Sequence, residues 1–348
     1  MTKYTGITVL FCTIFVSSSF AFAPNDMSLR KGISQRHDDD SQFRTTCAFN
    51  NNNINNNNIN NHNKRSSSTL ILNNSTPLTT STGIFAVMNL AGFIISILTQ
   101  SHIHLDLIGT GAFAIVGLFP LLGLSPTVTL NGRILASSAA MTLWGSKLAG
   151  FLFYRALILK HDARLASTLS TVPGTAVFWT ISFLWGLVCS LPHTLGTMST
   201  APRQYTMLGL FIFIIGFTVE TMADAQKWIF KGTNPGQFCN IGLWSISQHP
   251  NHFGNLVLWA GIFIINIPAL IGPPNTNVWI KYRRLALALL SPIFMGLLFH
   301  GQSSGTITNA VELAKMRYGN QAGYTQYIAE TPLIVPNVWK WIMGGTRA

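Results

Sequence analysis

Seven long apolar runs are the feature that most constrains what this chain can fold into. A helix that crosses a bilayer needs roughly 17–25 apolar residues. The chain is 48% hydrophobic and only 9% charged, whereas a soluble domain is about 25% charged. We therefore predict an all-α, polytopic integral membrane protein with about seven transmembrane helices. The runs are Gly83–Leu98, Leu107–Leu124, Ile134–Leu159, Thr175–Leu191, Tyr205–Val219, Phe253–Ile271 and Leu285–Phe299.

The segment before these runs has the composition of a targeting sequence. Residues 1–23 are typical of a signal peptide, with Lys3, an apolar stretch and then small residues. The junction Ser18–Pro24 resembles that of bipartite plastid presequences in diatoms and related algae, in which a transit peptide would begin at Phe22. Residues 24–80 combine bases, Ser and Thr with the Asn-rich tract Asn50–Asn63, which has too few apolar residues to order itself. We predict a membrane domain at 81–348 and a plastid membrane, with the endoplasmic reticulum as the alternative.

The charged residues exclude some functions and mark others. The formal charge is +12, but the bases are scattered between apolar runs, so we expect a lipid bilayer partner and no nucleic acid. His102 with His104, and His249 with His252, lack a thiolate or acid to complete a metal site, so no metal is expected. Acids that persist in a membrane protein raise a functional question. After residue 70 these are Asp106, Asp162, Glu220, Asp224, Glu312 and Glu330.

A charged stripe follows the run Tyr205–Val219. Glu220, Asp224, Lys227 and Lys231 are spaced i, i+4, i+7 and i+11, which places them on one face of a helix. Asp224 and Lys227 form a neighbouring i, i+3 pair. Two interpretations stay open: a salt-bridged helix end at the membrane interface, or a wall in which lysines meet cofactor phosphates and acids meet hydroxyls or amides.

The stretch Gly242–Asn255 places polar side chains at the start of an apolar helix. Pro250 suits a first helical turn, and the free N–H groups of that turn attract anions. His249, Asn251, His252 and Asn255 would lie at this helix mouth, where a membrane enzyme could hold a charged cofactor. The alternative is an interfacial loop whose polar residues only cap the helix.

Two further polar sets have simpler interpretations. Trp144, Lys147, Arg155, Asp162 and Arg164 fit membrane-interface anchoring by a tryptophan and snorkelling bases. Glu312–Asn320 looks like a short amphipathic helix that ends at Gly319. The tyrosines after it fit either an aromatic belt or a lid over a cofactor.

Four motifs in this order resemble the C-terminal domain of the steroid 5α-reductase superfamily, in its branch of uncharacterised reductase-like proteins. The resemblance covers roughly residues 85–340. The motifs are Trp144-Gly-Ser-Lys147-Leu with Arg155 and Asp162-Ala-Arg164; Glu220-Thr-Met-Ala-Asp224-Ala-Gln-Lys227-Trp-Ile-Phe230; Gly242 to Asn255; and a Glu, Tyr-Gly, Tyr-x-x-Tyr, Thr-Pro pattern from Glu312 to Pro336.

The resemblance implies an oxidoreductase acting on CH–CH donors. NADPH would reduce an activated carbon–carbon double bond in a sterol, prenol or other lipid, with hydride added to the β-carbon of a polarised enone. No motif identifies the catalytic acid. The cofactor-binding residues it implies are Glu220, Asp224, Lys227, Lys231, Trp244, His249, Asn251, His252, Asn255, Glu312, Arg317, Tyr318, Tyr324 and Tyr327.

Three departures from the family pattern keep other functions open. Gln248 replaces an arginine, His252 a tyrosine and Asn255 a glutamate. Loss of the arginine removes a charge-assisted phosphate contact worth about 1.5–3 kcal/mol. The alternatives are a membrane methyltransferase that uses S-adenosylmethionine, since such enzymes share a related His-Pro turn, and a non-catalytic lipid-binding protein with a degenerate cofactor site.

Overall fold

The computed structural model describes residues 76–124, 128–159, 169–199, 205–273, 275–306, 310–337 and 339. The predicted signal and transit segments lie outside these residues, apart from the end of the second, and so do Asp162 and Arg164. The helices are α2 (Pro77–Thr99), α3 (Leu105–Gly109), α4 (Gly111–Leu121), α5 (Gly132–Leu159), α7 (Val172–Gly196), α8 (Thr206–Thr233), η2 (Gly242–Ser245), α9 (Pro250–Ile271), α10 (Val278–Ser304), α11 (Ala310–Tyr318) and α12 (Tyr324–Glu330).

The prediction of an all-helical membrane protein is confirmed. Five helices are long and apolar enough to cross a bilayer, namely α2, α7, α8, α9 and α10. The other two predicted crossings differ from these. The run Leu107–Leu124 is divided at Thr110 into α3 and α4, while α5 carries Arg133, Lys147 and Arg155 along its 28 residues. The count of seven crossings therefore stays a prediction.

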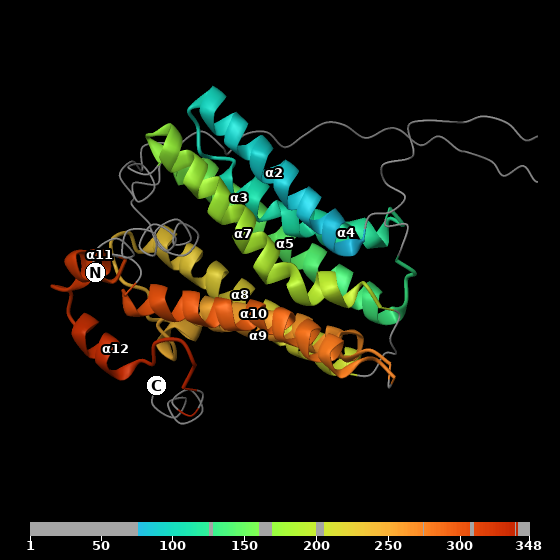
Figure 1. The fold of residues 1–348 in the computed structure, drawn as a ribbon. Coiled ribbons are helices and arrows are strands. Elements are labelled where there is room, and N and C mark those ends of the chain that lie inside the picture. Colours follow the sequence, from blue (N-terminus) through green and yellow to red (C-terminus); the bar gives the residue numbers. More distant parts are fainter. Residues whose placement is uncertain are drawn as a thin grey trace, which may run out of the picture.

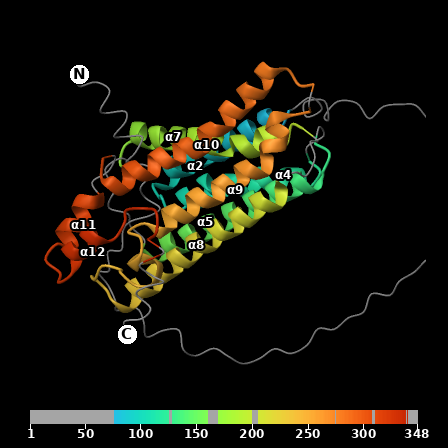
Figure 2. The same ribbon diagram turned by 90° about the horizontal axis from the view of Figure 1, so that it is seen from below.

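The long helices form an up-and-down bundle, seen from two directions in Figures 1 and 2. α8 packs along α9, α2 along α7 and α4 along α5, and α10 contacts both α7 and α9. We call the end of the bundle where α9 begins the cleft end, and the end where α10 begins the far end. The C-terminal helices α11 and α12 lie at the cleft end (Figure 1).

Glycines bring α8 and α9 into close contact. Gly209 and Gly216 on α8 face Gly261 and Gly254 on α9, and the two glycines of each helix are two turns apart. A Cβ atom added to Gly216 would lie 2.6 Å from the Gly254 carbonyl oxygen. Small residues allow such backbone contact between membrane helices. This contact sets the residues that follow Gly216 on α8 directly beside the start of α9.

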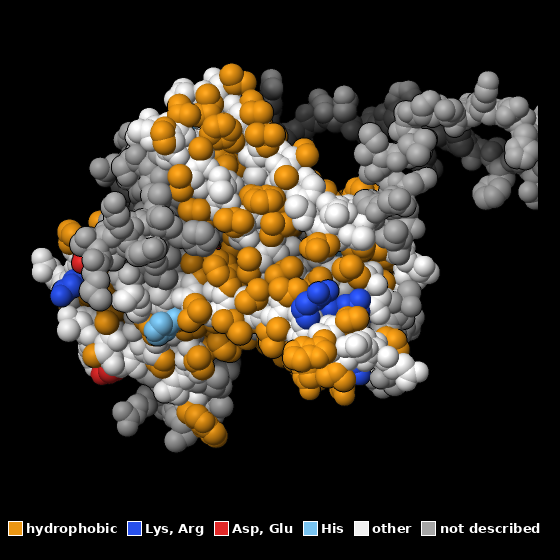
Figure 3. Space-filling model, in the orientation of Figure 1, with side chains coloured by type: hydrophobic (Ala, Val, Ile, Leu, Met, Phe, Trp, Pro, Cys, Tyr) orange, Lys and Arg blue, Asp and Glu red, His pale blue; other side chains and the backbone are white. Residues whose placement is uncertain are grey.

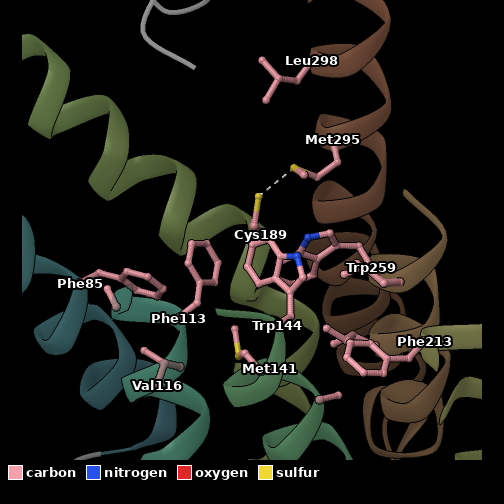
Figure 4. Close-up of a cluster of buried hydrophobic side chains, with 14 residues drawn as sticks. Phe85, Phe113, Val116, Met141, Trp144, Cys189, Phe213, Trp259, Met295 and Leu298 are labelled. Atoms are coloured by element: carbon pink, nitrogen blue, oxygen red, sulfur yellow. Dashed lines mark hydrogen bonds between the residues drawn. The ribbon is translucent and has the colours of Figure 1, made fainter. Parts of the chain in front are cut away.

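Aromatic side chains fill the centre of the bundle (Figure 4). Phe113 packs edge-on against Trp144, with ring centroids 5.2 Å apart, and Trp144 packs edge-on against Trp259 at 4.9 Å. The side chain of Trp144 is fully buried. The prediction that Trp144 anchors the membrane interface is therefore wrong, because its ring belongs to the core shared by α4, α5 and α9.

A buried hydrogen-bonded network joins α5, α7 and α9 nearer the far end. Arg133 on α5 donates to the Asn266 side-chain oxygen at 2.9 Å and to the Ser199 carbonyl. The Asn266 amide nitrogen donates to Ser137 at 2.7 Å, and the Ser137 hydroxyl lies 2.9 Å from His193 Nδ1. The network pairs most of its buried polar groups, which lipid could not solvate, whereas Arg133 Nε has no hydrogen-bond partner among the described residues.

Candidate functional site

A cleft opens among six helices at the cleft end of the bundle, and its space, together with the adjoining open solvent, is about 860 Å³. One wall is polar and comes mainly from α8 and α9, whereas the other is largely aromatic and aliphatic. The described residues that line it are Leu105, Asp106, Gly109, Thr110, Trp144, Leu148, Leu152, Phe178, Ser182, Trp185, Glu220, Asp224, Asn251, His252, Asn255, Met295, Leu298, Phe299 and Gln302.

A largely buried charge cluster lies at the polar wall. Lys147 on α5 places its Nζ atom 3.0 Å from Asp224 Oδ2 and 3.8 Å from Glu220 Oε2. The three side chains are 16%, 14% and 4% exposed, respectively. The prediction that Lys147 anchors the membrane interface is therefore wrong: its ammonium turns inward, because two carboxylates on α8 need a counter-charge in an apolar bundle.

Glu220 is also held by two neutral donors. The Trp144 indole N–H donates to Glu220 Oε2 at 3.1 Å, and the Asn255 amide nitrogen donates to Oε1 at 2.7 Å. These contacts fix the carboxylate between α5 and α9. They also set the orientation of the Asn255 amide: since its nitrogen faces a carboxylate, its oxygen is left as an acceptor.

Three buried amide atoms at the cleft have no hydrogen-bond partner among the described residues. They are the acceptors Asn251 Oδ1 and Asn255 Oδ1, and the donor Gln302 Nε2. Asn255 and Gln302 are each only 5% exposed. Buried polar atoms are normally paired, and leaving one unpaired costs about 1–3 kcal/mol. The three atoms are therefore available to pair with water or with a polar ligand group.

Three stacked aromatic rings lie along one side of the cleft, beside α10. The His252 ring is stacked on Phe299 with centroids 4.4 Å apart and on His249 at 5.0 Å. His252 Nδ1 lies 3.0 Å from the Ser303 hydroxyl. Burial, with the neighbouring His252, lowers the pKa of His249 well below its usual value, so this imidazole is neutral at pH 7.

The two lysines of the predicted stripe point elsewhere. Lys227 Nζ lies 4.1 Å from the centroid of the Trp244 ring. Lys231 is buried and donates to the Tyr318 hydroxyl at 2.8 Å and to the Gln237 carbonyl. The single-helix prediction for the stripe is correct, but only its two acids line the cleft, whereas its two lysines lie among residues of the 237–244 segment and α11.

The C-terminal tyrosines pack into the protein. Tyr324 and Tyr327 pack against Phe238 with ring centroids 5.3 and 5.4 Å apart, and the Tyr327 hydroxyl donates to the Trp244 carbonyl at 2.8 Å. Burial raises the pKa of both phenols. Tyr324 is 8% exposed, so the aromatic-belt interpretation is wrong for it, because its ring contacts protein and not headgroups.

Gln248 connects the helix mouth to the C-terminal segment. Its side-chain amide donates to the Ile328 carbonyl at 3.0 Å and to the Thr331 carbonyl at 2.6 Å, and its backbone N–H donates to the Pro332 carbonyl at 2.9 Å. Gln248 stands where the motif of the steroid 5α-reductase superfamily has an arginine. Its side chain binds the C-terminal segment instead.

The structure divides the fourteen predicted residues into two groups. Glu220, Asp224, Asn251, His252 and Asn255 line the cleft. The others lie around it or on the C-terminal segment, with Glu312 and Arg317 exposed on α11. Whether either group binds a cofactor stays a prediction. The second group is Lys227, Lys231, Trp244, His249, Glu312, Arg317, Tyr318, Tyr324 and Tyr327.

Sequence reasoning missed part of the cleft. Asp106 on α3 was recognisable as one of the few acids after residue 70, but no motif connected it with Glu220. Ser182 lies within an apolar run and Gln302 follows one, and neither residue belongs to a motif. The sequence predicts Lys147 only as an interface anchor, because its partners lie 73 and 77 positions away and local spacing cannot reveal them.

The bundle and its buried charged cleft define a polytopic helical membrane protein. Residues 92–331 match the family described as "Protein of unknown function (DUF1295)", and the chain belongs to this family. No curated protein and no solved structure matches the chain.

Proposed function

We propose that the protein is a membrane-embedded, NADPH-dependent reductase of an activated carbon–carbon double bond in a sterol, prenol or other lipid. Two findings support the general class. The steroid-reductase-like motifs occupy nearly the same part of the chain as the family match, and several acids and amides of these motifs line one cleft. The single observation that carries the proposal is the set of unpaired amide atoms in that cleft.

These atoms are complementary to a primary carboxamide. Asn251 and Asn255 lie four residues apart on α9, so they share a helix face and offer two acceptors. Gln302 on α10 offers one donor. A carboxamide carries two N–H donors and one carbonyl acceptor. The nicotinamide ring of NADPH bears such a group, and when bound it would supply hydride to the β-carbon of the substrate.

The opposite wall suits a lipid substrate. Leu148, Phe178, Trp185 and Leu298 give the cleft an apolar and aromatic side, as expected for a pocket that accepts a hydrophobic molecule. The polar wall and the apolar wall face the same space. A ring or chain bearing an enone could therefore lie between the cofactor and the hydrocarbon region.

The basic residues near the cleft fit the cofactor phosphates less well than the cleft amides fit the carboxamide. Lys231 is already engaged by Tyr318, and Lys227 lies over Trp244, so phosphate binding would require exchange of these contacts. Gln248 is occupied by tail carbonyls. This observation favours a second candidate function, a non-catalytic lipid-binding membrane protein that retains the fold but not the phosphate site.

Titration of the full chain in nanodiscs with NADPH, and separately with S-adenosylmethionine, distinguishes these functions. We expect NADPH to bind, and Asn255→Ala or Gln302→Ala to weaken its affinity by roughly 5–10-fold, the value of one hydrogen bond of about 1–1.5 kcal/mol. Asn240→Ala, at an exposed position outside the cleft, should leave the affinity unchanged.

Three outcomes would contradict the reductase. Binding of S-adenosylmethionine without NADPH would favour the methyltransferase. Binding of neither cofactor would favour the lipid-binding protein. NADPH affinity that is equal in wild type and in both amide variants would remove the carboxamide argument.

A further inference from the structure

The start of α10 carries a group of basic and aromatic side chains at the far end of the bundle. We call this group the α10 collar: Trp279, Lys281, Tyr282, Arg283 and Arg284. Trp279 is 82% exposed and Tyr282 is 65% exposed. Arg283 is exposed, whereas Lys281 and Arg284 are half-buried. Figure 3 shows Lys and Arg side chains gathered among hydrophobic ones at the end of the bundle where α10 begins.

No acid compensates this charge at the far end of the described bundle. The acidic residues that the structure describes all lie at the cleft end or on the C-terminal helices: Asp106, Glu220, Asp224, Glu312 and Glu330. Among the residues that the structure describes, the α10 collar is therefore a cationic surface without an acidic neighbour on its own side of the bundle.

The depth of the α10 collar corresponds to a headgroup layer. The remainder of α10, Leu285–Ser304, contains no Lys, Arg, Asp or Glu. At 1.5 Å per residue it is about 30 Å long, the thickness of the hydrocarbon core. Positions 279–284 add about 9 Å, comparable to the headgroup region on one side of a bilayer.

We propose that the α10 collar binds the headgroups of anionic phospholipids. The guanidinium groups of Arg283 and Arg284 can each donate two hydrogen bonds to a phosphate, and Lys281 adds a point charge. Trp279 and Tyr282 favour the same depth, because their rings combine an apolar body with a polar edge. The surface thus fits a negatively charged lipid better than a zwitterionic one.

Native mass spectrometry of the full chain released from nanodiscs tests this proposal. The nanodiscs contain phosphatidylcholine with a minor share of phosphatidylglycerol, and retained lipids are counted by class. We expect wild type to retain phosphatidylglycerol preferentially. Each base removed should lower the affinity for this lipid by about fivefold, so Arg283→Gln with Arg284→Gln should largely abolish the preference.

Three comparisons make the test specific. Arg283→Lys with Arg284→Lys keeps the charge and should keep most of the preference. Lys315→Gln removes an exposed base from α11 at the other end and should have no effect. The preference should also decline as the salt concentration rises. The proposal is overturned if the glutamine pair retains phosphatidylglycerol as wild type does, if Lys315→Gln loses it equally, or if the collar instead pairs two copies and only lipid-free dimers are seen.

Discussion

Replacement of Lys147 by methionine tests whether the buried charge cluster holds the bundle together. Methionine keeps much of the length of the lysine stem but removes the only base within 4 Å of both Glu220 and Asp224 in the described structure. Two carboxylates would then remain in an apolar environment without their counter-charge. Such a loss is more damaging than removal of a whole ion pair, because burial of an unpaired charge is costly.

The geometry gives the magnitude. With an effective dielectric constant of about 20, separations of 3.0 and 3.8 Å correspond to about 5.5 and 4.4 kcal/mol of Coulomb attraction. A carboxyl that loses its partner can instead take up a proton, which costs about 4 kcal/mol at pH 7 for an ordinary aspartate. We therefore expect Lys147→Met to lower the free energy of unfolding by about 3–5 kcal/mol.

The measurement is equilibrium unfolding of the purified chain in mixed micelles, followed by the helical circular dichroism signal during titration with a denaturing detergent. Lys147→Met combined with Asp224→Asn should recover most of the lost stability, since one uncompensated charge is gone, and the double-mutant cycle isolates the pair. Lys315→Met, at an exposed position of α11, should stay within about 0.5 kcal/mol of wild type. A loss below about 1 kcal/mol for Lys147→Met, or no recovery in the double variant, would refute this account.

Three other variants test the packing and the buried groups. A Cβ on Gly254 would lie 2.8 Å from the Gly216 carbonyl oxygen, so Gly254→Ala should cost about 1–3 kcal/mol in the same assay, whereas Gly150→Ala, which meets nothing within 4 Å, should be neutral or stabilising. Asn266→Leu leaves the Arg133 guanidinium without one acceptor and should cost about 2–3 kcal/mol; an unchanged midpoint would show the network to be dispensable. Burial raises the pKa of Cys239, so its thiolate fraction at any pH is below that of an ordinary thiol; its maleimide labelling at pH 7 should be slower than in the unfolded chain and increase with pH, and fast labelling at pH 7 would contradict its burial.

The helices followed from local sequence. Each predicted apolar run lies largely within described helices, since an apolar segment must satisfy its backbone hydrogen bonds within itself in lipid. The charged stripe and the short helix near Glu312 were also predictable, because both depend on spacing within one helix. Spacing alone predicts that the lysines of the stripe lie on the same wall as its acids. It cannot show that the longer lysine side chains turn away from the cleft.

Tertiary structure decided which of these groups meet. The sequence predicts Lys147 to be an interface anchor, yet the residue pairs with acids from another helix. Gln302 gave no sequence signal, yet it faces the same cleft as Asn255. By itself the sequence determined the helices and the polar residues they carry, because both are properties of neighbouring positions. The cleft required the close α8–α9 contact and the packing of α5 and α10 against it, since those contacts choose which face of each helix turns inward.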